Sequence, residues 1–260
     1  MSRRAFDPLW LVLGLITGGY LLFWLGLLGS AAVHSSPGDL WRALHSREIR
    51  YAIGLSLWTC TLTGLLSLLL AVPVGYLLAR GRFPGRALLD AALDIPIVLP
   101  PMVVGLCLLI FFQTLVGQLI ERVIPFTYTI AGVVLAQFVI GAAFAVRTMR
   151  GTFEELSARP EDVALTLGCT RTRAIWLVTL PAARRGMVAA ASIAWARSLG
   201  EFGPILVFAG ATRMKTEVLP TSVWLELSVG NLEAAIAVSM VMVVLAIVVL
   251  ASVRLMGERL

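Results

Sequence analysis

Long stretches without any charged residue recur along the chain and set its overall pattern. Five of these stretches lie at residues 8–33, 51–79, 95–120, 123–146 and 234–253. Each is longer than the ~18 residues that mark a candidate transmembrane helix. A sixth stretch of similar length, residues 186–212, contains Arg197 and Glu201 as its charged residues. The pattern therefore predicts an all-α membrane protein with six transmembrane helices.

We expect these spans to form a single transmembrane domain over residues 1–260. The expected spans are residues 9–33, 51–79, 95–116, 127–147, 186–210 and 232–254. The first span is expected to remain as an uncleaved anchor, because it is longer than the apolar core of about 7–15 residues in a cleaved signal peptide. Only seven residues follow Val253, so we expect no appended cytoplasmic domain.

The composition supports a membrane protein and excludes several other classes. Apolar residues make up 59% of the 260 residues and charged residues 14%, against about 45–50% and about 25% in soluble domains. The mean hydropathy is +0.91. These values exclude a soluble enzyme, a disordered chain and a coiled coil. A net charge of +6 can indicate nucleic acid, but the hydropathy favours a membrane protein that binds no nucleic acid.

The distribution of basic residues predicts the orientation in the membrane. If both termini are cytoplasmic, the inner segments contain 14 Arg and Lys residues and the outer segments contain six. Positively charged residues are enriched in cytoplasmic loops. We therefore expect both termini on the cytoplasmic side, together with residues 148–185, the longest polar loop.

The third span begins with a proline cluster that interrupts a regular helix. Pro96, Pro100 and Pro101 stand within six residues, and each lacks the amide hydrogen that a helix needs. The cluster indicates either a discontinuous helix along a transport pathway or a helix start at the inner membrane surface. The sequence leaves both interpretations open.

The fifth span contains Arg197 and Glu201, which are four residues apart and therefore share one helix face. Charges inside a membrane are costly unless they are paired or face water, so the two residues form either a functional site or a structural ion pair. Gly203 and the proline that follows it permit a kink. The candidate pore or gate residues are Pro96, Pro100, Pro101, Arg197, Glu201 and Gly203.

The polar loop at residues 148–185 contains the start and end signals of two short helices. A proline starts the first helix, and Glu161 and Asp162 in its first turn complement the helix dipole. Gly168 suits the position just after its end. A second helix is expected from Thr170 until the next proline ends it. Apolar residues left exposed on these helices would form a docking surface for a partner.

This loop resembles the EAA loop of ABC importer permeases. The match consists of Asp162-Val163-Ala164, three residues, Gly168, nine residues and Val178-Thr179-Leu180-Pro181. Asp replaces the Glu of the family pattern, and Val replaces its first Ala and its Ile, which conserves charge or shape. In that family the loop forms the coupling helix that binds the ATPase subunit. The residues that the resemblance assigns to this coupling are Glu161, Asp162, Ala164, Gly168, Leu180 and Pro181.

A second resemblance extends over nearly the whole chain. The motifs Pro96-x-Val98-x-Pro100-Pro101 and Leu199-Gly200-Glu201-Phe202-Gly203 are similar to those of the oxyanion branch of these permeases, which carries molybdate, tungstate and sulfate. The resemblance implies the type I ABC importer permease fold, with a cytoplasmic coupling-helix loop, in a bacterial or archaeal inner membrane. Molybdate or tungstate is the expected substrate. The alternatives are sulfate or thiosulfate, an iron complex, a polyamine or thiamine.

The same resemblance implies a set of partners. Two copies of an ABC ATPase subunit would bind ATP and Mg, and an extracytoplasmic substrate-binding protein would deliver the substrate. A second copy of this chain would complete the pore as a homodimer, because six spans enclose too little space for a pathway and its gates.

The sequence has no recognisable enzyme motif. His34 and His45 are the only histidines, which excludes histidine-based metal sites. Lys215, the only lysine, does not follow a glycine, so the Walker A motif is missing. We therefore expect this chain to bind no metal or cofactor and to leave ATP hydrolysis to its partner. Two alternatives stay open: a proton-coupled secondary transporter that uses Arg197 and Glu201, and an intramembrane enzyme.

Overall fold

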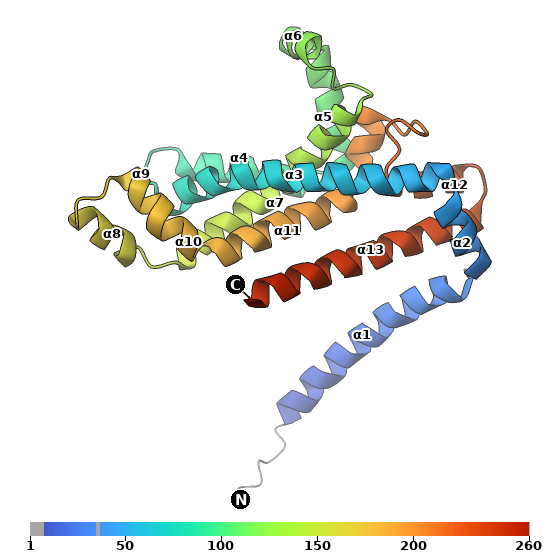
Figure 1. The fold of residues 1–260 in the computed structure, drawn as a ribbon, viewed down its shortest axis with the longest axis horizontal. Helices are drawn as coiled ribbons and strands as arrows, with labels where there is room; N and C mark the ends of the chain where they lie inside the picture. Colours follow the sequence, from blue (N-terminus) through green and yellow to red (C-terminus); the bar gives the residue numbers. More distant parts are fainter. Residues whose placement is uncertain (1–7, 35–36, 260) are drawn as a thin grey trace, which may run out of the picture.

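The computed structural model describes residues 8–34 and 37–259, and all regular structure in these ranges is helical (Figure 1). The first half contains α1 (Pro8–His34), α2 (Pro37–His45), α3 (Arg47–Arg80), α4 (Arg86–Val98), α5 (Pro101–Gln113), α6 (Leu115–Val123) and α7 (Ile130–Glu155). The second half contains α8 (Arg159–Thr166), α9 (Arg171–Ala174), η1 (Ile175–Thr179), α10 (Leu180–Ala182), α11 (Arg184–Leu199), η2 (Ile205–Ala209), α12 (Leu219–Ser228) and α13 (Leu232–Arg259). Both η elements are π-helices, a form that is frequent at functional sites. The prediction of an all-α protein is confirmed.

Helices α3, α7 and α11 form the central layer and run side by side (Figure 1). Ala71, Ala145 and Ala194 are fully buried between them. Gly75 allows a close approach of α3 to α7, since a Cβ atom at this position would stand 2.8 Å from the Cβ of Met149. Small residues dominate such contacts because helices in a membrane associate through close packing rather than through the hydrophobic effect.

Several helices extend away from the central layer. The element α13 packs against α11 and α12, whereas α1 diverges from the bundle (Figure 1). Large apolar side chains of α1 are exposed, for example Leu15 at 68% and Leu22 at 71%. On the other side of the layer, α5 and α6 project outwards (Figure 1). These apolar surfaces are available to lipid or to other subunits.

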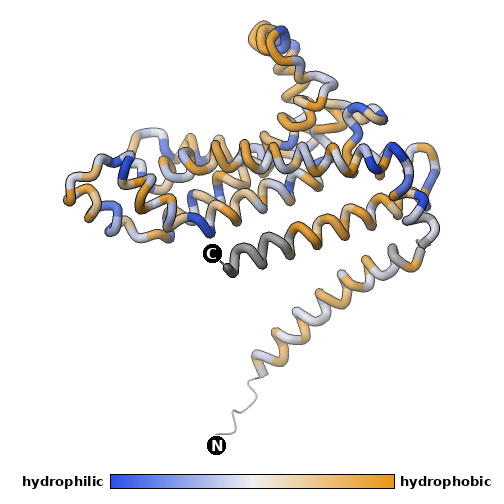
Figure 2. Tube along the Cα trace, in the orientation of Figure 1, coloured by the Kyte–Doolittle hydropathy of each residue, from blue (hydrophilic) through white to orange (hydrophobic). Residues whose placement is uncertain are grey.

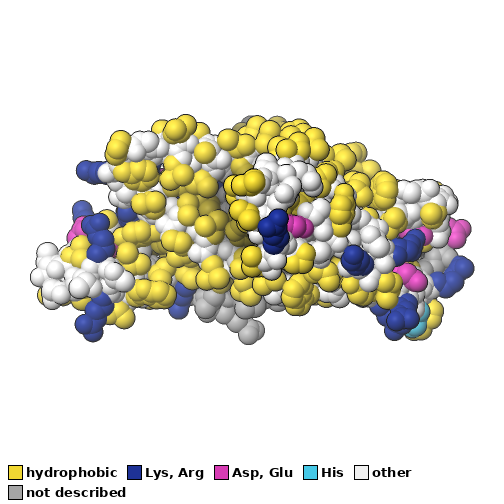
Figure 3. Space-filling model, turned by 90° about the horizontal axis from the view of Figure 1, so that it is seen from above, with side chains coloured by type: hydrophobic (Ala, Val, Ile, Leu, Met, Phe, Trp, Pro, Cys, Tyr) yellow, Lys and Arg dark blue, Asp and Glu magenta, His cyan; other side chains and the backbone are white. Residues whose placement is uncertain are grey.

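Polar residues gather at the two ends of the bundle. One end contains α8, α9 and α10, and the other contains α2 and α12 (Figure 1). The trace between these ends is predominantly hydrophobic (Figure 2). Figure 3 shows the same distribution on one face of the surface, where most charged side chains lie toward the ends. This layout is typical of a protein whose middle lies in the hydrocarbon core of a membrane.

Four single helices in the described ranges are long and apolar enough to cross a membrane, within α1, α3, α7 and α13. The pair α4–α5 adds a fifth candidate, which is bent by 110°. The expected span at 95–116 is divided into two helices, since α4 extends from Arg86 to Val98 and α5 begins at Pro101, which agrees with the discontinuous-helix interpretation of the proline cluster. The expected span at 186–210 is also interrupted, since α11 ends at Leu199 after 16 residues. The described ranges therefore contain four or five candidate spans, and the expected span at 186–210 is not among them.

The helix α7 continues to Glu155, so the first eight residues of the expected polar loop belong to α7. Ion pairs with α4 hold this polar end of α7 in place. Arg147 lies 3.6 Å from Asp94, and Arg150 hydrogen-bonds to Asp90. These side chains are partly exposed, so each pair contributes at most about 1 kcal/mol, but together they align α4 with α7.

Candidate functional site

The proline cluster forms the break between α4 and α5. Leu99 caps α4 and α5 begins at Pro101, so the bend falls at Leu99 (φ −65°, ψ 140°) and Pro100 (φ −54°, ψ 131°). Pro96 does not interrupt the helix, contrary to the expectation. The helix continues past it, as the hydrogen bond from the Leu99 amide to the Ile95 carbonyl at 3.0 Å shows.

A second break separates α11 from η2. Gly200 caps α11, and Glu201 and Phe202 lie between the two helical segments. Pro204 precedes η2 and keeps a helical backbone (φ −62°, ψ −37°). At the end of α11 the Ser198 carbonyl accepts from the Gly200 amide and, at 3.2 Å, from the Glu201 amide, in place of the regular bond from four residues on.

The two breaks pack directly against each other. A Cβ atom at Gly105 would stand 2.7 Å from the Cα of Pro204, and one at Gly203 would stand 2.9 Å from the Cγ and 3.0 Å from the amide nitrogen of Met102. Side chains do not tolerate such distances, so these contacts between α5 and the second break require glycine. Elements far apart in the sequence thus form one continuous patch.

The ion pair of the fifth span lies at this patch. A guanidinium nitrogen of Arg197 is 2.9 Å from Oε2 of Glu201, whose side chain is 2% exposed. Oε2 is at ion-pair distance but makes no well-aligned hydrogen bond within the described residues. Glu201 stands beyond the end of α11, so the pair bridges a helix end rather than one continuous helix face. The Arg197 guanidinium also lies over the ring of Phe144, 5.8 Å from its centre.

Gln137 on α7 supplies a partner to the end of α11, and the sequence analysis missed this residue. Its Nε2 donates to the Ser198 carbonyl at 3.3 Å, and its Oε1 accepts from the Thr63 hydroxyl at 3.2 Å. The side chain is 1% exposed. It is the only amide side chain within the charge-free stretch 123–146, and this isolated polar residue could have marked Gln137 as a candidate in the sequence. Gln137 therefore joins α3, α7 and α11 beside the second break.

The polar loop forms two short helices around Gly168, as the sequence predicts. Gly168 has a φ of 89°, which costs other residues steric strain. Thr170 caps α9 by accepting a hydrogen bond from the Arg173 amide. The expectation that Pro181 ends the second helix is wrong. The chain widens into the π-helix η1, in which the Leu180 amide bonds to the carbonyl five residues earlier, and continues through the proline.

Glu161 is turned into the protein instead of toward solvent. Its carboxylate accepts hydrogen bonds from the hydroxyls of Tyr76 on α3 and Thr179 on η1, the latter at 2.9 Å. Arg80, one turn further along α3, donates to the Leu156 carbonyl at the end of α7. These contacts, which we term the Glu161 clasp, attach the loop to α3.

The other residues assigned to the loop surface differ in their exposure. Asp162, Gly168 and Pro181 are exposed, whereas Ala164 and Leu180 are half-buried. The most exposed apolar side chains of α8 and its end are Val163 at 55% and Leu167 at 80%. An apolar surface on a polar loop is suited to contact with another protein.

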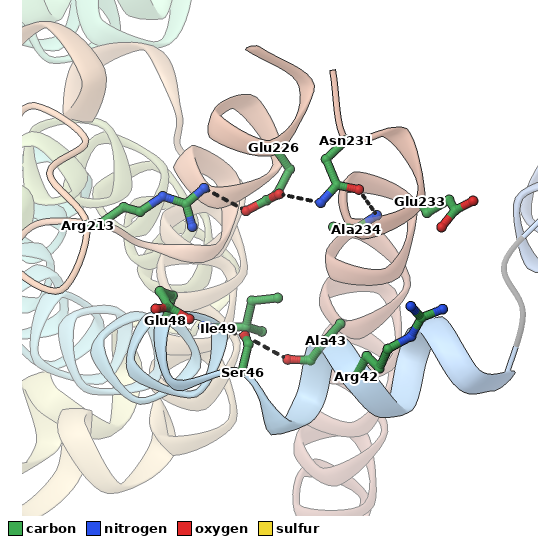
Figure 4. Close-up of a pocket in the computed structure, with 10 residues that line it drawn as sticks. All are labelled: Arg42, Ala43, Ser46, Glu48, Ile49, Arg213, Glu226, Asn231, Glu233 and Ala234. Atoms are coloured by element: carbon green, nitrogen blue, oxygen red, sulfur yellow. Dashed lines mark hydrogen bonds and ion pairs between the residues drawn. The ribbon is translucent and has the colours of Figure 1, made fainter. Parts of the chain in front are cut away.

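At the opposite end of the bundle lies a polar pocket of about 270 Å³ (Figure 4). Glu226 of α12 forms its centre, where Oε1 accepts from Arg213 at 2.7 Å and Oε2 from Asn231 at 3.0 Å. The hydrogen bond to Glu226 is the main cause that raises the pKa of Arg213 above its ordinary value. The charged residues that line the pocket are Arg42, Arg213, Glu48, Glu226 and Glu233.

Bent, interrupted helices that pack together between two polar ends define a multi-pass membrane protein of the transport class. The family described as binding-protein-dependent transport system inner membrane component matches residues 71–260. The chain belongs to this family. Members of the family are membrane components of transport systems and not enzymes.

Relatives in several organisms match most of the chain. A probable molybdenum ABC transporter permease of Haloferax volcanii is 33% identical over 94% of this chain and 88% of its own length. The sulfate permease CysT of Escherichia coli is 31% identical over 99% of this chain and 95% of its own length. The molybdenum permease ModB of Mycobacterium tuberculosis is 35% identical over 93% and 92%, respectively.

Solved structures share the fold. A chain of a bacterial alginate ABC transporter, solved in complex with a periplasmic protein, has a TM-score of 0.76 at 17% identity and covers 96% of this chain and 94% of its own length. A chain of the MetNI methionine ABC transporter has a TM-score of 0.63 at 20% identity, with coverage of 82% and 98%. At these identities the likeness supports the fold alone.

The ion pair provides a double-mutant test. Arg197→Gln leaves the buried carboxylate of Glu201 without its counter-charge. Glu201→Gln leaves the partly exposed guanidinium of Arg197 without its counter-charge. We expect each single variant to melt at a lower temperature than the double variant, with a coupling energy of about 1–3 kcal/mol and the larger loss for Arg197→Gln. Thermal unfolding of the purified chain in detergent measures this. Additive losses would show that the two side chains do not interact.

Proposed function

We propose that this chain is the permease subunit of an ATP-driven importer of a tetrahedral oxyanion, with molybdate or tungstate as the substrate. The observation that carries the proposal is the near full-length similarity to permeases named for molybdenum and sulfate. Two copies of the chain form the pore, two ATPase subunits bind on the cytoplasmic side, and a binding protein delivers the substrate outside. Both termini are cytoplasmic, in line with the excess of basic residues on that side.

The α8–α9 loop is the docking site for the ATPase subunit in this proposal. The exposed Val163 and Leu167 offer an apolar contact, and Gly168 sets the angle between the two short helices. The Glu161 clasp makes the loop part of a rigid unit with α3. When an ATPase subunit moves, the loop and α3 would therefore move together, because no flexible linker between them absorbs the motion.

The contact between the two helix breaks is the gate. Broken helices in a membrane need protein or water to satisfy their backbone groups, and the open side of such a break can line a water-filled pathway. A rigid shift of α3, α7 and α11 is passed to the second break through Gln137 and the Ser198 carbonyl. The glycine contacts would then separate or close as one unit.

A second copy of the chain fits the apolar surfaces of α1, α5 and α6. On α5 the exposed side chains include Met102 at 51%, Leu106 at 49% and Ile110 at 57%. These residues directly follow the proline break, so a symmetric partner would place two breaks beside one pathway.

The binding protein, rather than this chain, selects the substrate. The outer pocket of Figure 4 contains two arginines and three glutamates, so it does not concentrate anions. A pathway that releases its substrate quickly also needs only weak binding. Sulfate is the second candidate, because a sulfate permease matches 99% of the chain.

Substitutions in the loop test the coupling. Ala164→Glu adds a charge to the docking surface, and Gly168→Val forces a β-branched residue into a positive φ at a cost of about 1 kcal/mol or more. We expect both variants to insert in the membrane but to lose ATPase binding or ATP-driven uptake. Gly168→Asn serves as the matched control, since Asn tolerates this backbone and should keep most of the activity. Normal uptake by Ala164→Glu and Gly168→Val would remove the loop from this role.

The substrate is tested with the complex reconstituted in vesicles together with its binding protein. We expect ATP-dependent uptake of labelled molybdate and tungstate, with sulfate as a weaker competitor. Uptake should persist with a protonophore as long as ATP is supplied, which separates the importer from a proton-coupled transporter. Uptake of an iron complex, a polyamine or thiamine, without any oxyanion, would overturn the oxyanion assignment.

A further inference from the structure

Two adjoining cavities lie at the α8–α10 end of α3. The larger is an apolar groove of about 780 Å³ along α3, and the smaller is a polar pocket of about 380 Å³. Tyr76, Arg80, Gly81 and Arg171 line both cavities, so the two adjoin. We term them the α3 groove and the arginine pocket.

The α3 groove has the chemistry of a site for hydrocarbon. Leu69 and Leu77 of α3 and Trp176 of η1 line it, and their exposed fractions are 72%, 46% and 67%. The groove follows a helix long and apolar enough to cross the membrane. Trp176 and Arg171 both line the groove, and tryptophan prefers the boundary between the headgroups and the acyl chains. The groove volume lies within the range of about 300–1,000 Å³ typical of ligand sites.

The arginine pocket is positively charged. Its charged residues are Arg80, Arg82, Arg86, Arg171, Glu161 and Asp162, an excess of two positive charges. Glu161 already accepts two hydrogen bonds in its clasp, and Arg86 contacts Glu154 outside the pocket at 3.5 Å. Arg82 and Arg171 are exposed and line the same pocket.

Arg80 has unused hydrogen-bonding capacity. One terminal nitrogen donates to the Leu156 carbonyl, but the buried Nε has no acceptor in the part of the chain that the structure describes. A guanidinium offers several donors in one plane, a geometry that matches the oxygens of a phosphate group.

We propose that the α3 groove and the arginine pocket together bind an anionic phospholipid. The acyl chains lie along Leu69 and Leu77, and the phosphate lies between Arg80 and Arg171. A helix of a second copy in the groove would leave the arginines without a counter-charge, and an ATPase subunit would approach from the cytosol without filling a groove along the span. Basic pockets between membrane helices on the cytoplasmic side bind anionic headgroups elsewhere. The proposed function is needed only to assign the site to the inner leaflet.

The bound lipid would contact the Glu161 clasp. Tyr76 lines both cavities and donates to Glu161, so a lipid packed against Tyr76 supports the connection between α8 and α3. The lipid site would therefore strengthen the coupling of the loop to the membrane helices.

Lipid binding is measured on the purified full-length chain by native mass spectrometry, with dioleoyl phosphatidylglycerol and dioleoyl phosphatidylcholine as the probes. We expect tighter binding of the anionic lipid, and a loss of about fivefold in that preference for Arg171→Gln, since one interfacial arginine contributes about that factor. Arg122→Gln on α6, outside both cavities, is the matched control and should leave the preference unchanged. Transport is not needed for this readout, so its result stands apart from that of the uptake assay.

A second variant tests the apolar half without touching a charge. Leu69→Trp fills the groove, and we expect it to lower the affinity for both lipids while the preference for the anionic one is kept. Equal binding of the two lipids by the unaltered chain, or an unchanged preference in Arg171→Gln, would overturn the proposal. Efficient disulfide cross-linking of a Leu69→Cys variant to a second copy would also overturn it, since the groove would then be a subunit contact.

Discussion

Backbone groups that a broken helix frees inside a membrane find no partner in the hydrocarbon, so each needs one in the protein or in a water-filled cavity. In this chain the two breaks, between α4 and α5 and between α11 and η2, pack on each other. Local hydrogen bonds, such as those from the Val103 amide to the Pro100 carbonyl and from the Leu206 amide to the Phe202 carbonyl, both at 2.9 Å, satisfy backbone groups at each break. Gly105 and Gly203 make the contact close enough, and Gln137 donates a hydrogen bond to the Ser198 carbonyl. The central layer of α3, α7 and α11 holds Gln137 in place, and the remaining helices surround that layer.

The same layer links the breaks to the α8–α9 loop. Near the loop, α3 is tied to α8 and η1 by the Glu161 clasp. Further along, Thr63 ties α3 to Gln137 and thereby to α7 and the end of α11. Small residues along α3 leave little room for sliding against α7, as at Gly75. Under the proposed function, a displacement of the loop moves whole helices and in this way reaches the breaks. It does not depend on a chain of flexible side chains.

Local chemistry explains which features the sequence could predict. Charge-free stretches identify membrane helices, and a glycine followed by Thr170 identifies a helix end and a new start, so the fold class and the loop geometry at Gly168 were accessible. The sequence could not predict that α4 continues through Pro96, because the neighbouring hydrogen bonds decide whether a helix is interrupted at a proline. The contact of Met102 with Gly203 and the inward turn of Glu161 depend on which faces meet in space, which a local pattern does not contain.

The central claim is that the contact between the two breaks is the moving gate. The most direct test compares Gly105→Ala and Gly203→Ala in the reconstituted complex, with Gly200→Ala as the control, since a Cβ there meets its nearest atom at 3.9 Å. The measured quantity is the substrate transported per ATP hydrolysed. The account predicts a fall of about tenfold for the first two variants, because the added methyl group forces the breaks apart, and no change for the control. An unchanged ratio in both Gly105→Ala and Gly203→Ala would contradict it.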